Sequence, residues 1–289
     1  MALAAFFYSL QYLDVKTMSG TVGIWTIILT RGLGSLILTL FFILYTRPIS
    51  PFGEKKRLLL IRGVLGGATI SLSFLAVKNL NLSVATVIVS TSPILTGLMS
   101  CSTWTRTDLV STAICFTGLV ILSIQGITEE VHHFWIGFIA ALGSSFLSAL
   151  VNITIRDIRD ENTLVITLYA MSACVLMTTP AAIHEVVVNG LPILDAVHAT
   201  QLCLTGVASF SAQWLKTRSI QLSETLSVVV LRYLDVLFCL AWDLLLLHSY
   251  IPFYHYIGIT LIFFGCLLQV TQDDGRAAPE SDQSDAPAL

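Results

Sequence analysis

Ten apolar runs divide the chain, and they limit its possible folds more than any other feature. A helix that spans a lipid bilayer needs about 20 mostly apolar residues. The runs cover residues 2–13, 21–46, 58–78, 82–104, 108–126, 134–155, 163–188, 201–220, 223–247 and 254–271. Because lipid offers the backbone no hydrogen-bonding partner, spanning segments of this kind are helices. We therefore expect an all-α membrane protein with ten transmembrane helices.

The composition supports this fold class. Of the 289 residues, 55% are hydrophobic and 11% are charged, whereas a soluble domain carries about 25% charged residues. The loops between the runs are short, so they leave no room for a soluble domain. The lipid bilayer is thus an expected partner. A net charge of −3 does not suggest a nucleic-acid partner.

The distribution of basic residues predicts the orientation. With ten spans and an internal N-terminus, the outer loops contain only Lys16 and Lys78. The inner loops and the tail contain Arg47, Lys55, Lys56, Arg57, Arg106, Arg156, Arg159, Lys216, Arg218 and Arg276. Cytoplasmic loops carry such an excess of Lys and Arg, so both termini are expected in the cytoplasm of an unspecified membrane. The acidic end of the chain, residues 272–289, is expected to be a disordered cytoplasmic tail.

An internal repeat divides the chain into two halves. The stretch NLNLS at 79–83 aligns with SIQLS at 219–223, and the same offset places Gly66 on Gly206. Each half, 1–126 and 134–271, then contains five spans. An odd number of spans makes the two halves enter the membrane from opposite sides. This predicts two inverted five-helix repeats, an architecture found in many secondary transporters.

The first span is shorter than the repeat requires. The corresponding span of the second half begins near Phe134, which aligns before Met1. We therefore expect a shortened first helix, and we suspect an N-terminal truncation or a misplaced start codon.

Two charged residues lie in the middle of the run 223–247. Arg232 and Asp235 are three positions apart, so they share one face of a helix. A charge at the bilayer centre costs at least about 2.5–3.5 kcal/mol on insertion scales, and such residues are candidates for function. In one interpretation Arg232 binds an anionic group and Asp235 positions it or takes a proton. In the other, the two charges neutralise each other and hold the helix packing. Asp243, near the end of the same run, is expected at the interface.

Other polar residues at membrane depth are further candidates for substrate binding or coupling. Arg31 either extends toward a membrane surface or lines the cavity. Pro93 interrupts a span and frees backbone groups that Ser92 and its neighbours could satisfy. The remaining candidates are Gln213, Trp214, Tyr169 and Tyr233, although side chains of these types in a span more often serve packing.

The sequence does not indicate catalytic, metal or cofactor chemistry. Its six cysteines lie in apolar runs and form no CxxC pair, so neither a disulfide framework nor a zinc site is expected. His184-Glu185 lacks the second histidine of HExxH. No nucleophile elbow, P-loop or dinucleotide fingerprint is found. We expect no catalytic residue, no metal and no cofactor.

Two stretches carry a family resemblance. RGVLGGATISLSFLAVKNLNLSVATVIVSTSPILTGL (62–98) resembles the core hairpin of the EamA-type transporters of the drug/metabolite transporter superfamily. FSAQWLKTRSIQLSETLSVVVLRYLDVLF (210–238) is similar to the eighth and ninth helices of that family. Tyr233 and Asp235 resemble a Tyr-x-Glu variant in the G-type branch of solute carrier family 35. The Gly-Glu that commonly follows the fourth and ninth helices is absent, and the ninth helix lacks its usual proline.

The resemblance implies a metabolite carrier whose third, fourth, eighth and ninth helices enclose the site. We expect a secondary transporter of a small polar or anionic metabolite that works by alternating access. A homodimer is left open. The alternatives are a non-transporting membrane scaffold or sensor, and an intramembrane enzyme.

Overall fold

The computed structural model is all helical in the part of the chain that it describes. It describes residues 2–46, 52–99, 110, 113–114, 116–118, 120–121, 132–190, 196–222, 234–248 and 253–277. The helices are α1 (Ala2–Met18), α2 (Ile24–Tyr45), α3 (Lys56–Asn79), α4 (Leu82–Val89), α5 (Ser92–Met99), α7 (His132–Asp157), α8 (Thr163–Asn189), α9 (Ala196–Leu222), α11 (Leu234–Leu245) and α12 (Phe253–Ala277).

Four of these helices are long and apolar enough to cross a membrane. They are α2, α3, the Phe134–Asp157 part of α7, and α8. A shorter apolar segment, Tyr256–Gly265, lies within α12. The structure is thus an all-helical protein with several candidate spans, whereas the count of ten spans and the inverted repeat remain predictions.

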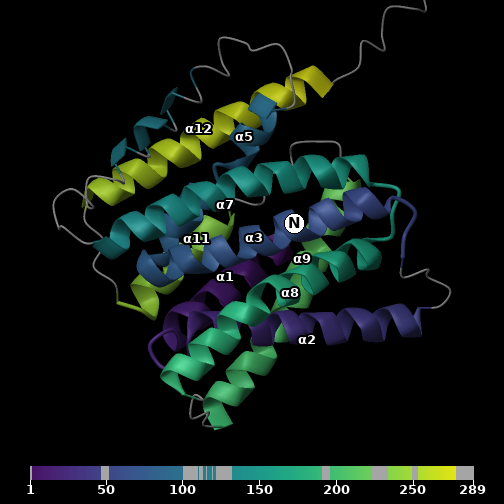
Figure 1. Cartoon of the computed structure of the whole chain (residues 1–289). Helices are drawn as coiled ribbons and strands as arrows, with labels where there is room; N and C mark the ends of the chain where they lie inside the picture. Colours follow the sequence, from purple (N-terminus) through teal and green to yellow (C-terminus); the bar gives the residue numbers. More distant parts are fainter. Residues whose placement is uncertain are drawn as a thin grey trace, which may run out of the picture.

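The helices form a layered bundle in which neighbours in space are distant in sequence (Figure 1). α3 packs on α7 and α8, while α9 packs on α1 and α2. α2 and α8 also pack against each other, and α12 contacts α4 and α5.

Glycines permit the closest of these approaches. A Cβ atom on Gly63 would lie 2.8 Å from the Tyr169 carbonyl oxygen, and one on Gly67 would lie 3.1 Å from the Cα of Cys174. Small residues four positions apart on α3 therefore allow α8 to pack against its backbone. α2 and α9 cross in the same way, because a Cβ on Gly34 would lie 3.1 Å from the Cα of Gly206.

The predicted run 82–104 is not one helix. It is divided into α4 and α5 at Ser90 and Thr91, just before Pro93. The hydroxyl of Thr91 donates to the Ile88 carbonyl oxygen at 2.7 Å and lies 2.8 Å from the Ser145 hydroxyl. The predicted interruption is confirmed, and the Ile88 carbonyl oxygen at the break accepts from both the hydroxyl and the backbone N–H of Thr91.

Two helices extend past the predicted boundaries. α1 continues from residue 13 to Met18, because its polar residues find partners: Asp14 accepts a hydrogen bond from Thr205 at 2.7 Å. α12 continues to Ala277, so the first residues of the predicted disordered tail are helical. The rest of the tail, 278–289, lies outside the described residues.

The turn between α3 and α4 is held from two sides. Lys16 Nζ donates to the Leu80 carbonyl oxygen at 2.6 Å and to that of Val77 at 3.2 Å, at the end of α3. Asp243 accepts from the backbone N–H groups of Leu82 and Ser83, at 3.2 and 2.7 Å, at the start of α4. Asp243 is fully buried within the protein, at the turn between α3 and α4, and its expected place at the membrane interface stays a prediction. Its carboxylate supplies acceptors that the first turn of a helix lacks.

Candidate functional site

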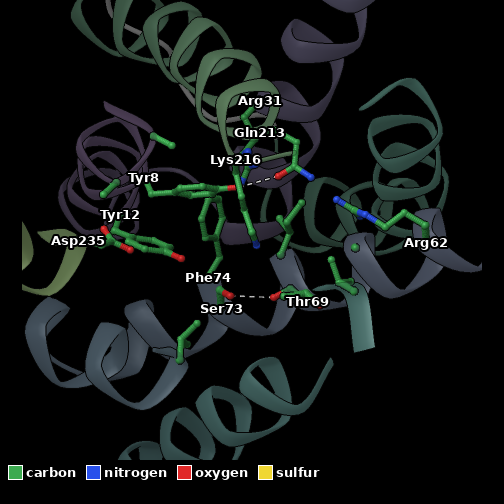
Figure 2. A pocket seen from close by; sticks show the side chains of 16 residues that line it. Tyr8, Tyr12, Arg31, Arg62, Thr69, Ser73, Phe74, Gln213, Lys216 and Asp235 are labelled. Atoms are coloured by element: carbon green, nitrogen blue, oxygen red, sulfur yellow. Dashed lines mark hydrogen bonds between the residues drawn. The ribbon is translucent and has the colours of Figure 1, made fainter. Parts of the chain in front are cut away.

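A cavity of about 50 Å³ lies at the centre of the bundle (Figure 2). It has room for a few water molecules. Its lining residues are Ala4, Ala5, Tyr8, Tyr12, Arg31, Arg62, Gly66, Thr69, Ile70, Ser73, Phe74, Val89, Val151, Gln213, Lys216 and Asp235. The helices that the family resemblance indicates, α3, α4, α9 and α11, all contribute, and α1, α2 and α7 contribute as well.

The described lining residues carry an excess of positive charge. Arg31, Arg62 and Lys216 are cationic, whereas Asp235 is the one carboxylate among them. All four side chains are buried. Charges at this depth are costly, so their convergence on one cavity favours a binding site.

Arg31 lies deep in the bundle and is held by neutral partners. Its Nε and Nη2 atoms donate to the Ser209 hydroxyl oxygen at 3.1 and 2.7 Å. Its guanidinium carbon lies 4.5 Å from the centre of the Phe74 ring. A cation over an aromatic face is stabilised electrostatically. Of the two sequence-based alternatives, the structure thus favours a residue that lines the cavity.

Arg62, in the second turn of α3, is 0% exposed. Its three guanidinium nitrogens have no hydrogen-bonding partner among the described residues. Gly66 lies one turn later, and an added Cβ there would overlap the Nη1 atom of Arg62. The absence of a side chain at Gly66 therefore makes room for the guanidinium.

The α9 face of the cavity presents Gln213 and Lys216, which are three positions apart. Gln213 Oε1 accepts a hydrogen bond from the Tyr8 hydroxyl at 2.6 Å. Lys216 Nζ lies 5.9 Å from the centre of the Tyr8 ring. The sequence-based topology counted Lys216 with the inner loops, although the run 201–220 contains it. In the structure Lys216 lies within α9, which continues to Leu222, and its side chain is buried.

Asp235 lies in the first turn of α11. In Figure 2 it lies beside Tyr12, on the opposite side of the cavity from Arg62. The Cys239 thiol is 3.9 Å from its Oδ1 atom. Arg232, the predicted partner of Asp235, lies outside the described residues, as does Tyr233. The proposed Arg232–Asp235 pair therefore remains a prediction.

Three of the predicted candidates do not line this cavity. Tyr169 lines a separate apolar groove between α3 and α8, and its hydroxyl donates to the Phe52 carbonyl oxygen at 3.1 Å. Trp214 is 36% exposed and is not among the residues that line the cavity. Ser92 is buried without a hydrogen-bonding partner for its hydroxyl among the described residues. Pro93 follows Ser92 in the first turn of α5. The Pro93 side chain lies outside the described part of the structure.

Of the lining residues, sequence reasoning named Arg31, Gln213 and Asp235, and it missed the aromatic and the other cationic ones. The missed residues are Tyr8, Tyr12, Arg62, Phe74 and Lys216. For Arg62 a signal was present, since it is a charged residue within the apolar run 58–78. Lys216 shares a helix face with Gln213, which is a second usable signal. The aromatic residues carry no comparable signal, because aromatic side chains are common in lipid-facing and core positions alike.

In the described portion of the chain, no three His, Cys, Asp or Glu residues form a group that could hold a metal ion. The cavity chemistry instead consists of fixed cations, one carboxylate, hydroxyl groups and an amide. This set can bind a polar or charged solute.

A family model described as the EamA-like transporter family matches residues 1–128 and 135–271. The chain belongs to the EamA-like transporter family. The predicted resemblance is confirmed, and the chain is accordingly a multi-pass membrane protein of a transporter family rather than of an enzyme family. The cavity lies between the two matched segments, because α1 to α4 come from the first and α7, α9 and α11 from the second.

Curated relatives and a solved structure agree with this assignment. Solute carrier family 35 member G1 of Homo sapiens is 22% identical, over 98% of this chain and 79% of its own length. The Mus musculus protein of the same name is 23% identical, over 84% of this chain and 69% of its own length. A chain of known crystal structure matches 93% of this chain and 96% of its own length, with a TM-score of 0.63 and 14% identity. That likeness shows a shared fold.

Proposed function

We propose that this protein is a secondary transporter of a small polar or anionic metabolite. The observation that carries the proposal is the buried, charged cavity between the two segments that match the family. A binding site near the midplane at the interface of two repeats is the arrangement from which secondary transporters work. Substrate contacts are assigned to Arg31, Arg62, Gln213, Lys216 and Asp235.

Helix packing supports the inverted repeat. If α1, α2 and α3 correspond to α7, α8 and α9, each pairing must recur with the partners exchanged. α3 packs on α7 and α8, and α9 correspondingly packs on α1 and α2. α2 and α8, which correspond to each other in the repeat, are also in contact. We therefore retain ten helices in two inverted halves, with both termini cytoplasmic, as part of the proposal.

The cavity size supports alternating access. A space of about 50 Å³ is smaller than the sites of about 300–1,000 Å³ that enclose typical small-molecule ligands. The helices around the cavity must move apart before a metabolite enters. A rocking motion of one half against the other supplies such an opening on either side.

Uptake by the full chain in liposomes tests the proposal. A panel of anionic, neutral and cationic metabolites is offered outside, and accumulation inside is measured against empty liposomes. We expect saturable uptake of at least one compound. A scaffold or sensor predicts no uptake of any compound.

A double substitution tests the charged pair. If Arg232 and Asp235 take part in binding or coupling, the Arg232→Ala, Asp235→Ala protein should lose at least about tenfold in uptake rate, because both charges act on the substrate or the coupling ion. The measurement is initial uptake at equal amounts of reconstituted protein. Full transport by the double variant would remove the pair from the mechanism.

A further inference from the structure

Arg62 is a buried charge for which the described protein supplies no counter-charge. Its side chain is fully enclosed, and none of its three nitrogens has a hydrogen-bonding partner among the described residues. Removing a guanidinium from water without replacing its hydrogen bonds destabilises a fold strongly. A residue of this kind is therefore expected to serve a partner that comes from outside the chain.

The neighbouring charges do not balance it. Arg31 is held by the Ser209 hydroxyl and the Phe74 ring, both of which are neutral. The ion pair found among the described residues, Lys55–Asp160, lies on the surface. Asp235 lines the cavity on the side opposite Arg62. The Arg62 end of the cavity thus has a positive electrostatic potential and hydrogen-bond donors without acceptors among the described residues.

We propose that Arg62 binds an oxyanion group, a carboxylate or a phosphate, of a substrate whose net charge is negative. This inference rests on the proposed transport function and assigns its substrate class. A guanidinium presents its donors in a planar fork that matches two oxygens of such a group. Arg31 adds a second cation that is already fixed in place, which strengthens attraction to the substrate without taking over the role of Arg62.

The geometry around Arg62 suits this role. Gly66 leaves the space that the guanidinium occupies, so the head group can turn within the cavity without meeting a side chain at that position. Gln213 lines the same cavity from α9 and offers an amide for hydrogen bonding. At the other end, the Asp235 carboxylate repels a second oxyanion and favours hydroxyl or amine groups. The substrate is therefore oriented with its anionic group toward α3.

The melting temperature of Arg62 variants distinguishes an anion-binding role of Arg62 from a structural role. If Arg62 holds the fold together, its removal lowers the melting temperature. If it is kept for an anion, its removal raises the melting temperature of the substrate-free protein, because an uncompensated buried charge disappears. The Arg62→Met substitution keeps an unbranched apolar side chain in place of the arginine stem and removes the charged head group. Arg57→Met is the matched control, since Arg57 lies on the same helix and is exposed.

The experiment measures thermal unfolding of the purified full chain in detergent at constant ionic strength. Wild type, Arg62→Met, Arg62→Lys and Arg57→Met are each heated alone and with succinate, glycerol 3-phosphate, glycerol or choline. Without additive, we expect Arg62→Met to melt about 2 °C or more above wild type. Succinate or glycerol 3-phosphate should raise the melting temperature of wild type and of Arg57→Met. Neither compound should raise the melting temperature of Arg62→Met. Arg62→Lys should respond more weakly than wild type, because lysine lacks the paired donors of a guanidinium.

The two anions distinguish a carboxylate site from a phosphate site, and a response to either supports the inference. Equal anion responses of wild type and Arg62→Met would overturn it, as would a melting temperature that falls on removal of Arg62. Stabilisation or liposome uptake that is confined to glycerol or choline would overturn the anionic substrate but leave the transporter intact. Absence of uptake for every compound in the liposome panel would instead overturn the transport function.

Discussion

Gly66 shows how a single missing side chain prepares the cavity. A Cβ atom there would overlap Arg62 Nη1, the far end of a flexible side chain, whereas no backbone of a neighbouring helix is among its close contacts. A substitution at this position should therefore displace the guanidinium without separating two helices. The effect is expected on binding rather than on folding.

We predict that Gly66→Ala raises the Kd for the bound anion about tenfold, equivalent to about 1.4 kcal/mol. The melting temperature should change little, because the arginine head can turn aside and alanine favours the helix. Anion titration followed by thermal shift or by uptake measures both effects. Gly20→Ala is the control, since nothing lies within 4 Å of a Cβ at Gly20. Unchanged anion affinity in Gly66→Ala would contradict the role assigned to the space that Gly66 leaves for the Arg62 guanidinium.

At the residue scale, the sequence predicts charged candidates better than it predicts their surroundings. Arg31, Gln213 and Asp235 line the cavity, and each was visible as a polar residue inside an apolar run. Lys216 was counted with the inner loops, because a position near the end of an apolar run does not show whether its side chain faces solvent or the interior. Tyr169 lies in another groove, since its position in a span does not show which neighbour it faces.

At the scale of elements, the start of α4 depends on a residue from a distant helix. Asp243 of α11 accepts hydrogen bonds from the Leu82 and Ser83 backbone and, at 2.7 Å, from the Ser83 hydroxyl. Lys16 at the end of α1 completes the same junction from the side of α3. The turn between α3 and α4 is thus fixed by side chains that come from both ends of the chain.

We predict that Asp243→Ala destabilises the protein by about 2–3 kcal/mol, because it leaves buried donors at the start of α4 without acceptors. Asp243→Asn keeps one acceptor oxygen and should lose less. Thermal unfolding monitored by tryptophan fluorescence measures the difference. Asp160→Ala is the control, since Asp160 is 77% exposed in its ion pair with Lys55 and such surface pairs contribute little. Equal losses of stability in Asp243→Ala and Asp160→Ala would show that the hydrogen bonds of Asp243 to the start of α4 contribute no more than a surface ion pair.

At the scale of the whole molecule, apolar runs predict most of the helices, while their ends and their packing come from the tertiary structure. The runs 21–46, 58–78, 134–155, 163–188 and 201–220 each correspond to one helix. The run 82–104 is divided because Pro93 and the Thr91 hydroxyl change the backbone bonding there. No local pattern predicts that α3 lies between α7 and α8, since that pairing depends on contacts between distant segments.

The orientation of the molecule is open to a direct test. If the excess of basic residues marks the cytoplasmic side, the turn between α1 and α2 faces outward and the start of α3 faces inward. In protein whose native cysteines are replaced by alanine, Gly20→Cys should react with a membrane-impermeant maleimide in intact cells. Lys56→Cys should react only after the membrane is permeabilised. The reverse labelling pattern would place both termini on the outside.

The contact between Gly34 and Gly206 has a consequence for motion. α2 carries Arg31 and α9 carries Gln213 and Lys216, so the angle at which these two helices cross sets the spacing between the cavity's polar groups. Where they cross, backbone meets backbone with no side chain from either glycine between them. A change of crossing angle at such a point requires little rearrangement of interlocked side chains. If the protein works by the alternating access proposed above, we expect the Gly34–Gly206 contact to be the pivot between α2 and α9, while the ends of the two helices move the furthest.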